Sequence, residues 1–210
     1  MIFQNRDEAG RKLAEALTEY TNKENTLILG LGKGGIVIAK AVAQALFLPL
    51  DILLTRKIGA PINDEFPIGA ITEHGTTYFD TRLIRQLQIS QDYLDSMVEQ
   101  EHIEAQKQIA LYRENLEASD FTGKRVIIVD DGLATGATAK VAIQAVRERK
   151  ATEVVLAVPM APVDAIPELK EAADRFICLH TPDPFYTVKQ FYFDFPDIAE
   201  EEIVRLLKEK

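Results

Sequence analysis

Apolar positions along the chain switch between short continuous runs and a spacing of three to four residues, which is the pattern of strands followed by helices. The spacing predicts a helix over 5–20, and the apolar run that follows predicts a strand over 25–31. A helix over 36–46 and a strand over 51–55 complete a β-loop-α-β unit. We expect the two strands of this unit to be parallel.

The middle of the chain has a different pattern. Glycine and proline interrupt residues 56–69, which predicts an exposed, mobile loop, and 68–72 with 76–79 predict a hairpin. Residues 90–116 contain no Gly or Pro and carry one apolar stripe, so we expect a long helix with the serine at its start as the N-cap. Because Glu101 interrupts the stripe, packing on the body is favoured over a coiled-coil seam.

The alternation of strands and helices resumes after this helix. We expect strands over 126–129, 154–159 and 176–179, and helices over 138–149 and 163–173. The fold class is therefore α/β, with a doubly wound parallel sheet, helices on both faces and a flexible loop or hairpin. We expect a single domain over 1–210, with a core over about 5–180 and an aromatic element and helix over 181–210. Ligands of such folds bind beyond the carboxyl ends of the strands.

Composition narrows the function classes. The 210 residues are 47% hydrophobic, as expected for one globular domain with a real core. A net charge of -9 disfavours nucleic-acid binding. No apolar run is long enough to span a bilayer and no apolar leader opens the chain, so we expect no membrane partner and a cytoplasmic location. The single Cys178 lies in an apolar strand pattern, which favours a buried thiol over a nucleophile.

The first candidate loop is G-L-G-K-G-G, Gly30 to Gly35, between a predicted strand and a predicted helix. Its spacing matches the dinucleotide fingerprint, but Asp51 opens the next strand instead of ending it. Backbone N–H groups at Gly34 and Gly35, with the charge of Lys33, are suited to a phosphate or pyrophosphate. A glycine turn that only allows close packing of helix on strand is the alternative.

The second candidate loop is V-I-I-V-D-D-G-L-A-T-G-A-T-A, residues 126–139. Asp130 and Asp131 end a buried strand, and two adjacent carboxylates can address the two hydroxyls of a vicinal diol. The next segment supplies exposed N–H groups and hydroxyls at a helix start, where phosphate binds well; its residues are Ala134, Thr135, Gly136, Ala137 and Thr138. Together they suit a ribose 5-phosphate. The alternative is capping, with one Asp on the turn and Thr138 on the helix.

At these residues the chain resembles the type I phosphoribosyltransferases, whose signature is four apolar residues, two acids and a small Thr/Gly-rich loop. More narrowly, it is similar to a bacterial group of phosphoribosyltransferases of unassigned substrate. The matching segments are 9–17, 34–35, 56–61, 68–70 and 192–195. One departure is Gly32-Lys33, where that group usually has Pro-Arg. Lysine keeps the charge but lacks the planar fork of arginine.

The resemblance implies a cytoplasmic transferase of nucleotide metabolism. It would move ribose 5-phosphate from phosphoribosyl pyrophosphate to a small nitrogenous acceptor, release pyrophosphate and use Mg²⁺ carried by the ligand. Asp130 and Asp131 would bind the ribose and serve catalysis, and 134–138 would bind the 5-phosphate. The pyrophosphate would be bound by Lys33, Gly34, Gly35, Arg56 and Lys57. The implied fold has a hood-like C-terminal element, and homodimers are common in the superfamily.

The sequence leaves the identity of the acceptor open. Ala134 stands where hypoxanthine-type enzymes have a carboxylate, which argues against that subclass. The aromatic stretch 185–195 could stack on a base, or its alternating Phe191, Phe193 and Phe195 could be one face of a core strand. Residues 59–66 could close over the ligand, or form an ordinary surface loop. A regulatory module that binds phosphoribosyl pyrophosphate or a nucleotide without turnover is the alternative function.

Overall fold

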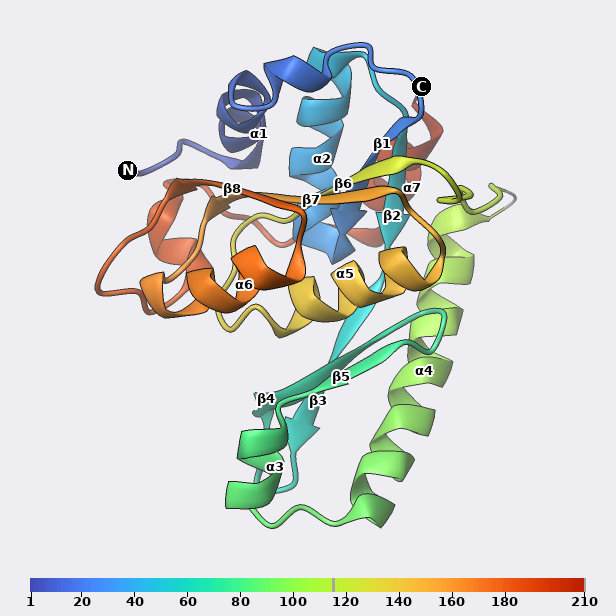
Figure 1. Ribbon diagram of the computed structural model, residues 1–210, viewed down its shortest axis with the longest axis vertical. Helices are drawn as coiled ribbons and strands as arrows, with labels where there is room; N and C mark the ends of the chain where they lie inside the picture. Colours follow the sequence, from blue (N-terminus) through green and yellow to red (C-terminus); the bar gives the residue numbers. More distant parts are fainter. Residues whose placement is uncertain (115, 210) are drawn as a thin grey trace.

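A computed structural model describes residues 1–114 and 116–209 (Figure 1). Its centre is a five-stranded parallel sheet in the order β2-β1-β6-β7-β8. The strands are β1 (Thr26–Leu31), β2 (Leu50–Leu53), β6 (Arg125–Val129), β7 (Glu153–Met160) and β8 (Arg175–His180). This confirms the predicted doubly wound α/β fold, including the parallel pairing of the first two strands.

Helices cover both faces of this sheet because successive strand residues point to opposite sides. Ile127 and Val129 pack with α1 (Arg6–Glu15) and α2 (Gly32–Leu46) on one face. Val126 and Ile128 pack with α5 (Ala137–Glu148) and α6 (Ile166–Ala172) on the other. Figure 1 shows α1 and α2 on one side of the sheet and α5 and α6 on the other. The two cores therefore hold the strand ends in fixed positions.

A second unit, here called the arm (residues 55–113), extends from the central sheet (Figure 1). It is a three-stranded antiparallel sheet, β3-β4-β5, with a short helix and the long helix packed on it. Its elements are β3 (Thr55–Ala60), β4 (Asn63–Thr72), β5 (Thr77–Phe79), α3 (Thr81–Gln86) and α4 (Gln91–Arg113). The β4–β5 hairpin confirms the prediction for 68–72 and 76–79.

The predicted loop over 56–69 is wrong, because most of it lies in β3 and β4. Its glycines allow close approach between strands and do not break them. A side chain at Gly59 would come within 2.2 Å of the Asp64 carbonyl oxygen, and one at Gly69 within 2.5 Å of that of Tyr78. Ile58 and Ile68 face the arm core.

Most other helix and strand predictions are confirmed within a few residues. Ser90 caps α4 as expected, since its hydroxyl accepts from the Tyr93 backbone N–H at 3.3 Å. The helix ends at Arg113, and residue 115 of the predicted helix lies outside the described residues. Two predicted helices end or begin in a 3-10 turn; these turns are η1 (Thr18–Tyr20) and η2 (Val163–Ala165).

The C-terminal segment is η3 (Val188–Phe191), a connection, and α7 (Glu200–Lys208). The expected alternating strand face over Phe191, Phe193 and Phe195 is wrong, since Phe191 is buried and Phe193 is 82% exposed. A single bridge joins Tyr192 to Phe3 instead of a ladder. Within residues 1–114 and 116–209, no helix combines the length and apolar character that crossing a bilayer requires.

Candidate active site

Two neighbouring strands of the central sheet bring the predicted site residues together. β1 and β6 are parallel and paired, so the start of α2 after β1 lies beside the loop after β6. A side chain built on Gly34 would come within 2.0 Å of Asp131 Oδ2, and one on Gly35 within 3.3 Å of Asp130 Oδ1. The first turn of α2 is thus packed directly against the acid pair, Asp130 and Asp131.

The glycine motif is not a separate loop. Gly30 lies in β1, and α2 begins at Gly32 without an intervening segment. The close contacts at Gly34 and Gly35 support the packing interpretation of the motif. Anion binding remains compatible with it, because the first backbone N–H groups of a helix have no intrahelical acceptor.

The acid pair lies in a mostly buried setting that disfavours two negative charges. Burial and the neighbouring charge of Asp131 raise the pKa of Asp130 well above its ordinary value, although Lys57 and Arg6 oppose the rise. Burial also raises the pKa of Asp131, against the opposing effect of Arg6. The pair therefore binds a proton more readily than two exposed aspartates would.

Arg6, in the first turn of α1, contacts the candidate site, and no pattern in the sequence indicated this contact. Its Nε donates to Asp131 Oδ2 at 2.8 Å, and the two side chains are only 9% and 14% exposed. Its guanidinium also donates to the Pro196 carbonyl oxygen at 2.8 Å and lies over the Phe195 ring, 3.6 Å from the centroid. A separation of 125 residues from Asp131 left no local signal for this contact.

The C-terminal segment covers the loop after Asp131. The Tyr192 hydroxyl donates to the Asp131 carbonyl oxygen at 2.6 Å. A side chain at Gly132 would meet Val188 at 2.8 Å and the Met160 sulfur at 2.5 Å. The segment is therefore part of the site's wall, and its anchoring tyrosine was not predicted as a site residue.

The predicted 5-phosphate segment, 134–138, forms the open start of α5. Gly136 is the N-cap in a left-handed conformation, with φ of 75°, which glycine adopts without strain. Ala134 and Thr135 are exposed, and the Thr135 hydroxyl accepts from the Ala137 N–H at 3.4 Å. Thr138 lies inside the helix, so the interpretation that it caps α5 is wrong.

The predicted pyrophosphate cations divide into two groups. Lys57 is exposed and its charge acts on Asp130. Lys33 instead pairs with Glu200 of α7 at 3.3 Å, and Arg56 pairs with Glu101 of α4. Thus Lys57 acts on the acid pair directly, whereas the other two cations are engaged with helices α7 and α4.

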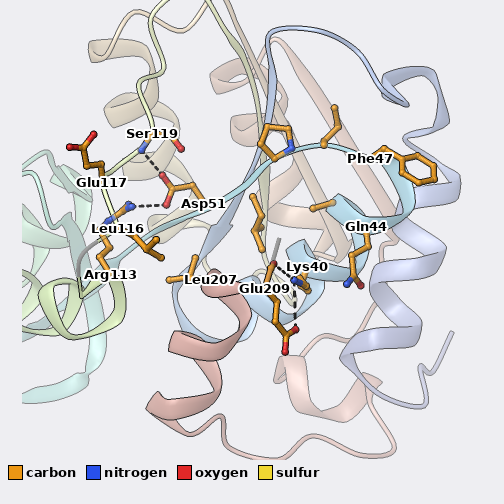
Figure 2. A pocket seen from close by; sticks show the side chains of 14 residues that line it. Lys40, Gln44, Phe47, Asp51, Arg113, Leu116, Glu117, Ser119, Leu207 and Glu209 are labelled. Atoms are coloured by element: carbon orange, nitrogen blue, oxygen red, sulfur yellow. Dashed lines mark hydrogen bonds and ion pairs between the residues drawn. The ribbon is translucent and has the colours of Figure 1, made fainter.

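A cavity of about 610 Å³ lies elsewhere, along the edge strand β2 between α2, α7 and the end of α4 (Figure 2). Its polar groups bind one another. Asp51 accepts from Arg113 and from the Ser119 N–H, each at 2.7 Å, and Lys40 donates to carbonyl oxygens at the end of α7. Because these charges are already satisfied, the cavity offers less chemistry than the acid pair.

The acid pair suits a magnesium ion that arrives with a ligand. Carboxylate oxygens are hard donors of the kind Mg²⁺ prefers, but one oxygen of Asp131 already accepts from Arg6. Among the described residues, no group of three or more His, Cys, Asp or Glu side chains could hold a metal ion alone. Ligand oxygens would have to supply most of the coordination.

Comparison with known proteins gives one consistent family. The model of the phosphoribosyl transferase domain matches residues 2–195. A Mycobacterium tuberculosis protein named "Putative phosphoribosyl transferase MT0597" is 38% identical over 206 residues, which cover 98% of this chain and 46% of that protein. The chain therefore spans less than half the length of this relative.

Solved structures agree on the fold. The crystal structure of TT1426 from Thermus thermophilus has a TM-score of 0.83 at 36% identity, covering 100% of this chain and 99% of that one. A purine phosphoribosyltransferase from Pyrococcus horikoshii has a TM-score of 0.50 at 20% identity, covering 92% of each chain. The second likeness concerns the fold alone.

Proposed function

The chain belongs to the phosphoribosyl transferase domain family, and we propose that it is a phosphoribosyltransferase. It transfers ribose 5-phosphate from phosphoribosyl pyrophosphate to a nitrogen nucleophile and releases pyrophosphate. The bond between the anomeric carbon and the pyrophosphate oxygen breaks, a carbon–nitrogen bond forms, and the acceptor nitrogen loses its proton.

The observation that carries this proposal is the meeting of the acid pair with two helix starts at one edge of the sheet. Asp130 and Asp131 follow β6, the first turn of α2 packs against them, and the open start of α5 comes a few residues later. Hydroxyl binding and anion binding at adjacent points match a phosphorylated sugar that bears a second anionic group.

Positioning and charge stabilisation explain how such a site would work. The sugar gains positive charge as pyrophosphate leaves, so a carboxylate held near the ring stabilises the transition state. The N–H groups at the start of α5 bind the 5-phosphate and fix the ring position. Lys57, Gly34 and Gly35 face the leaving group. Lys33 and Arg56 also bind pyrophosphate, and to do so they leave their ion pairs with Glu200 and Glu101.

Magnesium bound through the ligand's phosphate oxygens, beside Asp130 and Asp131, would neutralise charge on the departing pyrophosphate.

We propose that the acceptor binds against the C-terminal segment 185–195. This is supported by the contacts of Val188 and Tyr192 with the loop after Asp131, since this loop borders the proposed sugar site. Exposed Tyr186 and Phe193 offer aromatic faces to a flat heterocycle. Ala134 supplies no carboxylate base, so the acceptor's proton leaves to solvent or to a group of the ligand.

The test measures pyrophosphate release from phosphoribosyl pyrophosphate and Mg²⁺ with a panel of purine and pyrimidine bases. We expect release with at least one base, abolished in the Asp130→Asn, Asp131→Asn double variant. Tight binding of phosphoribosyl pyrophosphate without release of pyrophosphate with any base would contradict an enzyme. It would support the regulatory module instead. Absence of binding would refute both.

A further inference from the structure

Arg6 stands in a position that its own helix does not favour. It is the first residue of α1, where the helix dipole favours negative side chains, and Asp7 and Glu8 follow it. Yet its side chain is nearly buried, because it turns away from the helix toward Asp131. A buried arginine at a helix start therefore requires an explanation outside α1.

The loop after β6 and the C-terminal segment both contact this guanidinium. Nε donates to Asp131 Oδ2 at 2.8 Å, Nη1 donates to the Pro196 carbonyl oxygen at 2.8 Å, and the Phe195 ring lies 3.6 Å away. A planar fork suits this combination of carboxylate, carbonyl and aromatic face, whereas an ammonium group would match one of them at a time. Arg6 thus fixes the acid loop and the C-terminal segment relative to each other.

Resting on the proposed function, we propose that Arg6 is the positioning residue of the acid pair. It holds the Asp131 side chain against the first turn of α2 and ties it to the C-terminal segment, and it leaves Asp130 to bind the sugar hydroxyls. The two adjacent acids therefore have different tasks, and Arg6 assigns them.

The charges around the pair support this division. Two carboxylates this close do not both ionise easily, so a cation bonded to one of them selects the member that carries the charge. Arg6 from α1 bonds Asp131, and Lys57 from β3 acts on Asp130. Tyr192, from the C-terminal segment, stays protonated because burial and Asp131 raise its pKa. Without Arg6, the pair would keep its protons to higher pH.

The experiment reads the acid pair without any ligand. Carbon-13 NMR of the aspartate carboxyl carbons follows their titration in the native protein and in Arg6→Gln and Arg6→Lys. We expect Arg6→Gln to raise the lower apparent pKa of the pair by about one unit or more. Arg6→Lys keeps the positive charge and serves as the test if Arg6→Gln does not fold. It should raise the same apparent pKa by less than Arg6→Gln does. Arg11→Gln, on an exposed arginine of the same helix, should leave the titration unchanged.

A second measurement links this to binding. The dissociation constant for phosphoribosyl pyrophosphate with Mg²⁺ is measured by calorimetry between pH 5.5 and 9. We expect binding by Arg6→Gln to be weaker by up to about tenfold at the acid end of this range, with recovery as pH rises, because a shift of one pKa unit changes the population of a charge state by at most a factor of ten. A merely structural role would weaken binding equally at every pH. An unchanged titration in both Arg6 variants overturns the inference, whereas a native protein that binds no sugar pyrophosphate overturns the proposed function alone.

Discussion

Asp51 in β2 and Asp131 just after β6 each pair with one nearly buried arginine, but they differ in the hydrogen bonds that their carboxylates accept. Asp51 accepts three N–H donors, from Arg113, Ser119 and Ile52, each at 2.7 Å. The Asp131 carboxylate accepts from the Arg6 guanidinium at 2.8 Å, and its other side-chain partner is a second acid, Asp130, which brings no positive charge.

The difference separates a structural pair from a site. A buried carboxylate with all its hydrogen bonds made stabilises one conformation and offers nothing to a ligand. A buried acid pair with incomplete neutralisation is expected where a ligand or metal supplies the missing partners. This is why we propose the functional site at the end of β6 and not in the cavity of about 610 Å³ along β2.

The largest effect should come from breaking the structural pair. Arg113→Met leaves Asp51 buried without its cation, which costs about 3–5 kcal/mol of unfolding free energy. Urea unfolding at pH 7 measures it. Arg11→Met, which removes an exposed cation, is the control and should change little. Equal losses of unfolding free energy in the two variants would show that the buried ion pair stabilises the fold no more than an exposed one.

A third buried acid, Glu73, extends the comparison because its carboxylate oxygens have no hydrogen-bond partner among the described residues. Burial raises the pKa of Glu73 to about 7. A raised pKa gives stability that is present below about pH 4.5 and is lost as pH rises through about 7. Glu73→Gln should therefore stabilise the protein by up to about 3 kcal/mol at pH 8 and hardly at pH 4.5. A gain that is the same at both pH values contradicts this.

Single amide substitutions sharpen the comparison of the two sites. Asp51→Asn should cost about 1–3 kcal/mol, because it loses a charged acceptor of three donors. Asp130→Asn should be neutral or stabilising at pH 7, because the raised pKa of Asp130 means that its charge opposes folding. Chemical unfolding of both variants at pH 7 measures the difference. A larger loss for Asp130→Asn would reverse the assignment of roles.

The smallest effect is expected at the surface. Glu168 of α6, whose side chain is 47% exposed, pairs with Lys140 of α5 and with the exposed Arg82 of the arm. Glu168→Gln should cost less than about 1 kcal/mol and lose even that at high salt. Thermal unfolding at two salt concentrations measures this loss of stability. A loss as large as that of Arg113→Met would contradict the expectation that exposed ion pairs contribute little.

The parallel sheet and its two-sided core could be predicted because continuous apolar runs and helical spacing are local signals. In the arm, the hairpin and the long helix could be predicted, but the strand pairing over 56–69 could not. Gly59 and Gly69 act there through close cross-strand contacts, and a glycine-rich composition by itself is typical of a turn. The acid pair was predicted as the site from two adjacent carboxylates at a strand end, and this assignment stays a prediction. Arg6 and Tyr192 were missed because they reach Asp131 across 125 and 61 residues.

The most direct test of the central claim is the change in melting temperature on adding phosphoribosyl pyrophosphate with Mg²⁺. We expect a clear rise for the native protein and for Asp51→Asn, whose starting stability is lower, because a ligand that binds only the folded state stabilises it. The Asp130→Asn, Asp131→Asn variant should lose most of the rise. A double variant that responds like the native protein would contradict the account.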